Sequence, residues 1–382
     1  MQVALFCVSS LGYVKLSSEQ AMERPVDPYF LLFYTTKMSY DLARLPEAKA
    51  KVAGGFSEEC FFGSPSKPGA LQALLAQAID RVPAGGEILW ATYYLANVVL
   101  MERLRLASLR GVKLMVALEA RPRRPAVNAE AFKRLGALTG LSLVPVRSQI
   151  CAHLHEKLYY FSHPQPFFLV GSYNPSMDAS LDADAVLDIG DQDQGHNVLV
   201  QVDSAQAVER VRQHLRAYLG EAAPVPYALT DELAVTFLPE DGRAPHLQWL
   251  QRDWQEIHIA MSHLRDGTVV NRLGRQAGKG CKVRIICHES HRRFPARHEH
   301  ALRDAGVEVF RYCHPRQFPM HSKYTLLANG TERISLYGSL NFTKTSRWLN
   351  REVLVRSDAA GTYDSLLANW HDIRQEIERG YG

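Results

Sequence analysis

The sequence lacks the patterns that mark several common classes of protein. Its 382 residues include six cysteines, and none of these forms a Cys-x-x-Cys pair. Neither a zinc knuckle nor a disulfide framework is therefore indicated. No run of about 18 apolar residues occurs, so we expect no membrane-spanning helix. The formal net charge is only +4, which is too small to indicate a nucleic-acid partner by itself.

The composition is that of an ordinary globular protein. Hydrophobic residues make up 46% of the chain and charged residues 22%. The length suffices for two domains of roughly 100–200 residues each. Residues 3–12 are mildly apolar, but no Lys or Arg precedes them, so they are a weak candidate for a signal peptide. We expect a soluble or peripheral protein, and the composition points to no particular compartment.

A short polar pattern occurs twice, in the order His-x-Lys and then Gly-Ser-x-Asn. Its polar members are His155, Lys157, Ser172 and Asn174 in the first copy and His321, Lys323, Ser339 and Asn341 in the second. Alternate residues of an extended chain face one side, so each His-Lys pair and each Ser-Asn pair points at one spot. Two such sets suit an anion with a tetrahedral centre. One imidazole can attack phosphorus and the other can protonate the leaving oxygen, while Lys and Asn hold the remaining oxygens.

Helical and strand patterns alternate along the chain on both sides of the first motif. Residues 71–79 have apolar positions at helical spacing, 87–94 are typical of a buried strand, and Gly111 ends a predicted helix at 95–110. A strand at 113–118, a helix at 129–138 and a short strand at 141–145 follow. An offset of 169 residues aligns Glu256-Ile257 with Glu87-Ile88, so the pattern is duplicated. The predicted fold class is α/β, with two similar halves that each hold a parallel or mixed sheet flanked by helices.

The duplication divides the chain into three predicted regions. Residues 1–54 form an N-terminal extension, in which the apolar runs at 3–7 and 29–34 are typical of strands. The first half covers 55–222 and the second 228–382, each closed by a helix (205–219 and 362–378), and 220–227 is the predicted linker. Two related halves with one motif each predict a pseudo-twofold axis, with one active site at their interface.

At these residues the sequence resembles the phospholipase D superfamily, whose signature is His-x-Lys, four residues, Asp, six residues, Gly-Ser-x-Asn. Ser162 and Ala328 stand where the superfamily has Asp, and the Lys-to-Gly distances of 14 and 15 residues exceed the pattern. Some branches, tyrosyl-DNA phosphodiesterases among them, also lack this Asp. The resemblance implies a metal-independent phosphodiesterase that forms a covalent phosphohistidine, with no cofactor. Because both motifs lie in one chain, it also implies that no partner chain is needed to complete the site.

Glu352 lies where the superfamily places the carboxylate that orients a motif histidine. The apolar residues 353–355 that follow Glu352 align with residues 198–200. Asn197 is therefore the equivalent of Glu352 in the first half. We expect Glu352 to hold His321 and Asn197 to hold His155, which makes the halves chemically unequal. Two-motif relatives imply His155 as nucleophile and His321 as general acid, whereas a carboxylate on His321 favours the reverse, so both assignments stay open.

Basic residues repeat with the same offset. Arg123-Arg124 aligns with Arg292-Arg293, and each pair follows a strand whose carboxyl end borders the predicted site. We expect these arginines to bind an anionic substrate, the alternative being a solvated basic loop. The histidines have spacings that also occur in metal sites, namely His153 with His155, and His288, His291, His298 and His300 near Glu299. We predict no metal site, because the implied mechanism uses none.

The leading functional prediction is a phosphodiesterase that hydrolyses or transfers across a phosphodiester bond. A phospholipid substrate with peripheral membrane contact is preferred, on the modest net charge, the aromatic residues at 159–161 and 167–168, and the two-motif layout. The alternative is a nuclease or nucleic-acid end-processing phosphodiesterase with the same chemistry, favoured by the missing motif aspartates. A third hypothesis is an inactive repeat protein that only binds anions.

Overall fold

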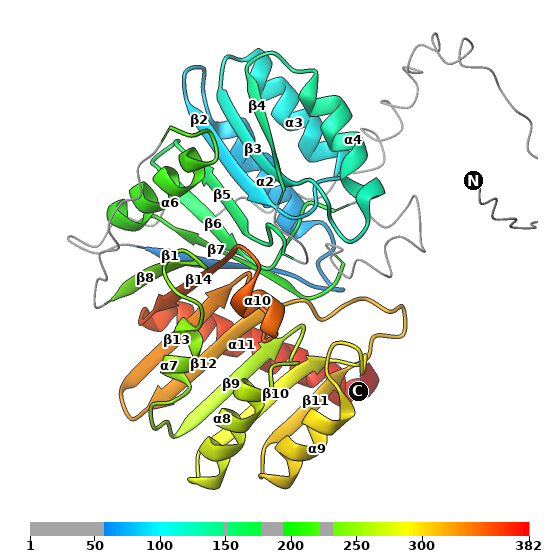
Figure 1. Cartoon of the computed structure of the whole chain (residues 1–382), viewed down its shortest axis with the longest axis vertical. Coiled ribbons are helices and arrows are strands. Elements are labelled where there is room, and N and C mark those ends of the chain that lie inside the picture. Colours follow the sequence, from blue (N-terminus) through cyan, green and yellow to red (C-terminus); the bar gives the residue numbers. More distant parts are fainter. Residues whose placement is uncertain (1–56, 148–151, 177–193, 222–231, 382) are drawn as a thin grey trace, which may run out of the picture. The chain divides into compact units, whose positions relative to one another are not determined.

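The computed structural model describes residues 57–147, 152–176, 194–221 and 232–381 (Figure 1). The predicted extension at 1–54, with its two strands, and most of the predicted linker at 220–227 lie outside the described residues. The bounds of the three predicted regions therefore stay a prediction. None of the helices in the described ranges combines the length and hydropathy that a membrane span requires.

The first sheet has seven strands in the order β1-β7-β6-β5-β2-β3-β4. Its strands are β1 (Glu58–Gly63), β2 (Glu87–Thr92), β3 (Lys113–Glu119), β4 (Leu141–Val146), β5 (Lys157–Phe161), β6 (Phe167–Gly171) and β7 (Asn197–Val202). β2, β3 and β4 run parallel to one another, and the other neighbours are antiparallel. The sheet is therefore mixed, with a parallel edge built from βαβ units.

The second sheet repeats this arrangement. Its order is β11-β10-β9-β12-β13-β14-β8, which is the first order read from the opposite edge. The strands are β8 (Leu233–Leu238), β9 (Glu256–Met261), β10 (Lys282–His288), β11 (Glu308–Tyr312), β12 (Lys323–Asn329), β13 (Glu332–Gly338) and β14 (Glu352–Ser357). The prediction of two similar α/β halves with mixed sheets is confirmed.

Helices connect the strands of both halves. They are α2 (Ala70–Arg81), α3 (Val98–Leu109), α4 (Pro125–Gly136) and α6 (Ala205–Ala217) in the first half, and α7 (Pro245–Trp249), α8 (Gly267–Gly278), α9 (Ala296–Asp304), α10 (Lys344–Trp348) and α11 (Ala360–Glu376) in the second, followed by a π-type turn at Ile377–Tyr381. The helix predicted at 95–110 begins only at Val98, because the Asn97 side chain accepts the Leu100 N–H and caps it. The helix predicted at 129–138 begins earlier, at Pro125, because proline suits the first helical turn.

One apolar cluster joins the two sheets. It contains Leu158 and Val200 of the first half together with Val353 and Val355 of the second, and Trp370 of α11 packs in the same cluster. Every residue of β2, β5 and β6 is buried, as expected for strands covered on both faces. The halves therefore share a core, which holds the two motif regions against each other.

The motif glycines lie where neighbouring strands approach closely. A Cβ atom on Gly171 would lie 2.1 Å from the Val198 carbonyl oxygen, and one on Gly338 would lie 2.2 Å from that of Val353. Gly338 also has a φ of 146°, which other residues rarely adopt. β7 and β14 begin at Asn197 and Glu352, so these glycines allow the strands that carry the two residues to lie close to the motifs.

We expect Gly338→Ala to lower the free energy of unfolding by about 2–4 kcal/mol, because the methyl group meets backbone atoms and the φ is unfavourable. Chemical denaturation with circular dichroism measures this change. Gly361→Ala in α11 is the control, since a Cβ there meets no atom within 4 Å. It should change the stability by less than about 1 kcal/mol. Equal losses in the two variants would contradict the steric explanation.

Candidate active site

Each motif histidine is held by backbone from the other half. The strands β5 and β12 begin at the motif lysines, so both histidines lie just before their strands rather than within them. The His155 N–H donates to the Arg351 carbonyl over 2.8 Å, and the His321 N–H donates to the His196 carbonyl over 2.9 Å. The two motif segments therefore meet at the interface between the halves.

The side chains that orient the two histidines also come from the opposite half in each case. Glu352 Oε2 lies 2.8 Å from His155 Nδ1, and Asn197 Oδ1 lies 3.0 Å from His321 Nδ1. The expectation that Glu352 holds His321 and Asn197 holds His155 is wrong. Glu352 directly follows Arg351, which is paired with His155, and Asn197 directly follows the residue paired with His321. Each orienting side chain therefore reaches the histidine of the opposite half.

These contacts define the reactive nitrogen of each imidazole. Carboxylate and amide oxygens accept hydrogen bonds, so Nδ1 of each ring carries the proton and Nε2 is the basic atom. The motif serines contact the orienting residues: Ser339 donates to Glu352 Oε2 over 2.5 Å, and Ser172 donates to Asn197 Oδ1 over 3.1 Å. The hydroxyls thereby fix the side chains that fix the imidazoles.

The electrostatic surroundings favour a neutral imidazole on His155 and an ionised Glu352. Burial lowers the pKa of His155 below its ordinary value of 6.5; Glu352 opposes this shift, and the charges of Lys157 and Lys323 reinforce it. Burial raises the pKa of Glu352, but His155, Lys157 and the hydrogen bond from Ser339 outweigh it, so the net pKa is lowered. A neutral imidazole beside a carboxylate is the form that can attack phosphorus.

Both motif lysines are fully buried. The Lys157 ammonium donates to the His155 carbonyl over 2.8 Å, and that of Lys323 donates to the His321 carbonyl over 2.7 Å. Lys323 Nζ also lies 2.9 Å from His321 Nε2. The motif residues Asn174 and Asn341 are buried as well. Buried donors of this kind stabilise an anion strongly, because little water competes with them.

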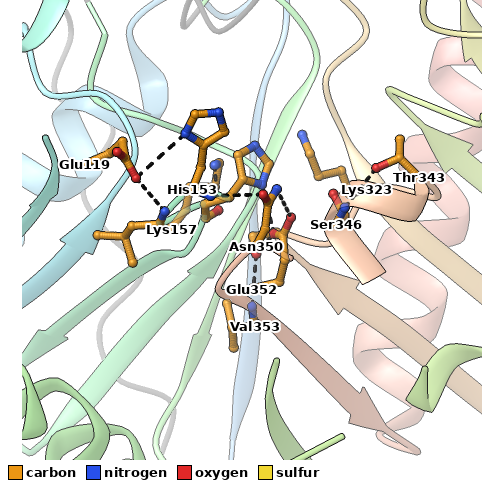
Figure 2. Close-up of polar contacts among 12 residues, drawn as sticks. Glu119, His153, Lys157, Lys323, Thr343, Ser346, Asn350, Glu352 and Val353 are labelled. Atoms are coloured by element: carbon orange, nitrogen blue, oxygen red, sulfur yellow. Dashed lines mark hydrogen bonds and ion pairs between the residues drawn. The ribbon is translucent and has the colours of Figure 1, made fainter. Parts of the chain in front are cut away.

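Three residues not predicted from the sequence complete the first side of the site. The Tyr93 ring lies 5.5 Å from the His155 ring. Asn350 donates from Nδ2 to Glu352 Oε1 over 3.1 Å and accepts the His153 N–H through Oδ1, so it braces both segments, as Figure 2 shows. Glu119 Oε2 accepts the Leu154 N–H over 2.6 Å. Tyr93 and Glu119 follow or end β2 and β3, so the rule that ligands bind at the carboxyl ends of strands would have found them.

The four predicted arginines differ in their burial and in their contacts with the site. Arg293 is buried and donates to Ser262 Oγ over 3.3 Å, and Ser262 is hydrogen-bonded to the second motif segment through its backbone. Arg292 is exposed, and its charge acts on His288. The Arg123 N–H donates to the Tyr93 hydroxyl, which places this loop beside His155.

Arg124, the partner of Arg293 in the duplication, is half-buried and occupies the N-cap position of α4. Within the described ranges, no group of three or more His, Cys, Asp or Glu side chains is arranged to hold a metal ion. The His153 imidazole instead lies 3.9 Å from Glu119 Oε2, and His288 Nδ1 accepts the Ser290 N–H.

The fold and the paired motifs define a class of protein. The family described as "Cardiolipin synthase, PLD-like domain" matches residues 75–219 and 247–373, more than half of the chain. The chain therefore belongs to this phospholipase D-like family, as the motifs predicted.

Two solved structures show the same fold. Polyphosphate kinase from Porphyromonas gingivalis is 17% identical with a TM-score of 0.60; the match covers 82% of this chain but only 46% of the kinase. Phosphatidylserine synthase from Haemophilus influenzae Rd KW20 is 14% identical with a TM-score of 0.57, over 85% of this chain and 86% of the synthase. None of the curated protein sequences matches the chain significantly.

Glu352→Gln tests the crossed pairing. We expect it to lower the rate of phosphodiester cleavage by about 10²- to 10⁴-fold, because an amide cannot stabilise the charge that develops on His155. Cleavage of bis(p-nitrophenyl) phosphate measures the rate. Glu240→Gln, which alters a carboxylate with an exposed side chain, is the control and should stay within about twofold. A Glu352→Gln enzyme with full activity would exclude the carboxylate from the reaction.

The pH dependence tests the state of His155. An imidazole with a lowered pKa remains neutral to a lower pH than an ordinary histidine. We therefore expect kcat/KM to decrease on the acid side with a midpoint below pH 6.5. Glu352 raises the pKa of His155, so its replacement by Gln should move this limb to still lower pH. A wild-type limb above pH 6.5 would show that the nucleophile is another group or that His155 is stabilised as a cation.

Proposed function

We propose that this protein is a phosphodiesterase of phospholipase D type that acts through a covalent phosphohistidine. The observation that carries the proposal is the pair of oriented imidazoles, one from each half, beside two buried ammonium groups. Each ring has its Nδ1 engaged by an orienting side chain, and Nε2 of His321 lies 2.9 Å from the Lys323 ammonium. This is the arrangement that a two-step displacement at phosphorus requires.

In the proposed mechanism His155 is the nucleophile. Its Nε2 attacks phosphorus, the bond to the leaving oxygen breaks, and His321 in its protonated form gives that oxygen a proton. His321 then takes a proton from water, which attacks phosphorus and releases His155. Glu352 stabilises the positive charge on the phosphorylated imidazole, whereas Asn197 leaves His321 the better proton donor. The crossed pairing thus favours the assignment that the family resemblance implies.

The site residues divide by role in this proposal. Lys157, Lys323, Asn174 and Asn341 bind the non-bridging phosphate oxygens. Ser172 and Ser339 are positioning residues, since their hydroxyls contact the orienting side chains. Among the predicted arginines, Arg293 is the one that contacts the second motif region through a buried side chain. No cofactor, metal or partner chain takes part in the proposed reaction.

We propose a phospholipid as the substrate, reached by peripheral contact with a membrane. Trp348 and Leu349 are 44% and 46% exposed and immediately precede Asn350, which contacts Glu352. The Cζ atom of Arg243 lies over the Trp348 ring, 5.5 Å from the ring centroid. An exposed aromatic residue with a basic neighbour at the rim of a site suits the boundary between lipid chains and phosphate groups. The family name and the similarity to a phosphatidylserine synthase agree with this choice.

A nucleic acid is the second candidate, because both copies of the motif lack the aspartate, as in tyrosyl-DNA phosphodiesterases. Labelled phosphatidyl lipids in vesicles, and single- and double-stranded DNA and RNA, distinguish the two. Release of a lipid head group or its exchange for an added alcohol supports the lipid, and cleaved oligonucleotides support the alternative. Turnover of none of them, with anion binding retained, would instead support an inactive repeat protein.

A substrate labelled on its phosphoryl group should transfer the label to the enzyme. After rapid denaturation of the enzyme, we expect this label on the peptide that contains His155. His155→Asn should abolish this adduct, because the amide is not a nucleophile. His321→Asn should prolong its lifetime, since no base then activates water. Peptide mapping by mass spectrometry locates the label. Labelling of the peptide that contains His321 in the His155→Asn variant would reverse the assignment.

A further inference from the structure

Two imidazoles and a guanidinium gather beside the second motif. His263 follows β9, His288 ends β10, and Arg293 lies in the loop after β10. The His263 carbonyl accepts the N–H of Phe342, which directly follows the motif residue Asn341. The backbone N–H of Ser262, the residue before His263, donates to the carbonyl of Ser322 between the motif His and Lys. His263 is therefore held between the two segments of the second motif.

Side-chain contacts link this group into one basic cluster. Arg293 Nη1 donates to Ser262 Oγ over 3.3 Å, and the same oxygen lies 3.1 Å from His263 Nδ1. Arg293 is buried, whereas His263 and His288 are half-buried. The charges of Arg293 and His321 act on both imidazoles. We call His263, His288 and Arg293 the basic cluster.

Burial sets the protonation of the two imidazoles. Burial lowers the pKa of His263 well below 6.5, and Arg293, Lys323, His321 and His288 lower it further. Burial likewise lowers the pKa of His288 to about 3, with Arg293, His321, Arg292 and Arg311 adding to the shift. Both imidazoles are therefore uncharged near neutral pH, and each can donate one hydrogen bond. The Arg293 guanidinium supplies the positive charge of the cluster, which would attract an anion placed among the three side chains.

The first half has a different chemistry at the equivalent positions. The offset of 169 residues places Glu119 where the second half has His288, and Tyr93-Tyr94 where it has Ser262-His263. Glu119 is only 1% exposed, and its position beside His153 is seen in Figure 2. A buried carboxylate repels an anion. The site is therefore polarised, with a basic side next to His321 and an acidic group on the side of His155.

We propose that the leaving group of the reaction carries a phosphate of its own, which the basic cluster binds. This inference rests on the proposed function. The attacking and leaving atoms lie nearly in line across phosphorus, so the leaving oxygen departs on the side of His321, where the cluster lies. The bond from phosphorus to this oxygen breaks, His321 supplies the proton, and the other substituent stays on the phosphoryl group bound to His155. The phosphate belongs to a phosphorylated alcohol or to a nucleotide.

The test uses a diester of two glycerols, one of which bears a phosphomonoester at its far hydroxyl. Departure of the phosphorylated arm gives two molecules of glycerol phosphate, whereas departure of the plain arm gives glycerol and glycerol bisphosphate. We expect glycerol phosphate to exceed glycerol bisphosphate by about 10- to 100-fold, as charge-assisted hydrogen bonds imply. The plain bis(glycerol) phosphodiester, assayed in parallel, reports cleavage without the extra phosphate.

Variants of the cluster should remove this preference. His263→Gln and Arg293→Lys should each lower the product ratio by about 10-fold, since one donor or the planar fork is lost. His300→Gln, which replaces an exposed histidine of α9, is the control and should keep the wild-type ratio. The ratio compares two products of one enzyme, so a partly unfolded variant still reports it.

Each outcome has a separate meaning. If the wild type cleaves neither diester, the proposed function fails. Without a preference glycerol phosphate is twice glycerol bisphosphate, because each departure of the phosphorylated arm gives two molecules of it. If the wild type cleaves both diesters and the ratio is at or below this value, the inference is overturned and the proposed function stands. A nucleoside diphosphate linked to glycerol, whose leaving group is a nucleoside monophosphate, distinguishes the two sources of the phosphate. The source with the higher kcat/KM is the one that the site selects.

Discussion

The exchange of orienting residues between the halves is the constraint on which the site depends. Glu352 is completely buried, and a buried carboxylate without partners costs several kcal/mol. Its partners are His155 of the other half and Ser339 and Asn350 of its own. The carboxylate is therefore satisfied only when the two halves are docked. Docking of the halves therefore orients His155 and completes the contacts of Glu352.

The duplicated fold also explains how a symmetric frame supports the directional reaction that we propose. The two sheets have the same strand order, and the histidines, lysines, serines and asparagines of the motifs are repeated. The residues around them differ: a carboxylate orients one histidine and an amide the other. In the proposed mechanism one imidazole attacks and the other transfers a proton, although the backbone positions both in the same way.

The strand and helix patterns were predictable because they depend on local spacing. Apolar residues at helical intervals predicted α2, and buried runs predicted β2 and β3. The differences are confined to helix ends, where Asn97 caps α3 and Pro125 begins α4. The contacts of Tyr93 and Asn350 were not predicted, since neither residue belongs to a repeated pattern. Their roles arise from loops that meet across the sheet edge and the interface.

The amino-acid sequence by itself determined the class of fold and the family to which the chain belongs. Two copies of His-x-Lys and Gly-Ser-x-Asn, repeated with alternating strand and helix patterns, were sufficient for both. Only the tertiary structure decided which orienting residue meets which histidine, and on which side the basic cluster lies. The physical reason is that residues 197 and 352 reach their partners across an interface between separate sheets. Spacing along the chain specifies the face of a strand, but not which half supplies its neighbour.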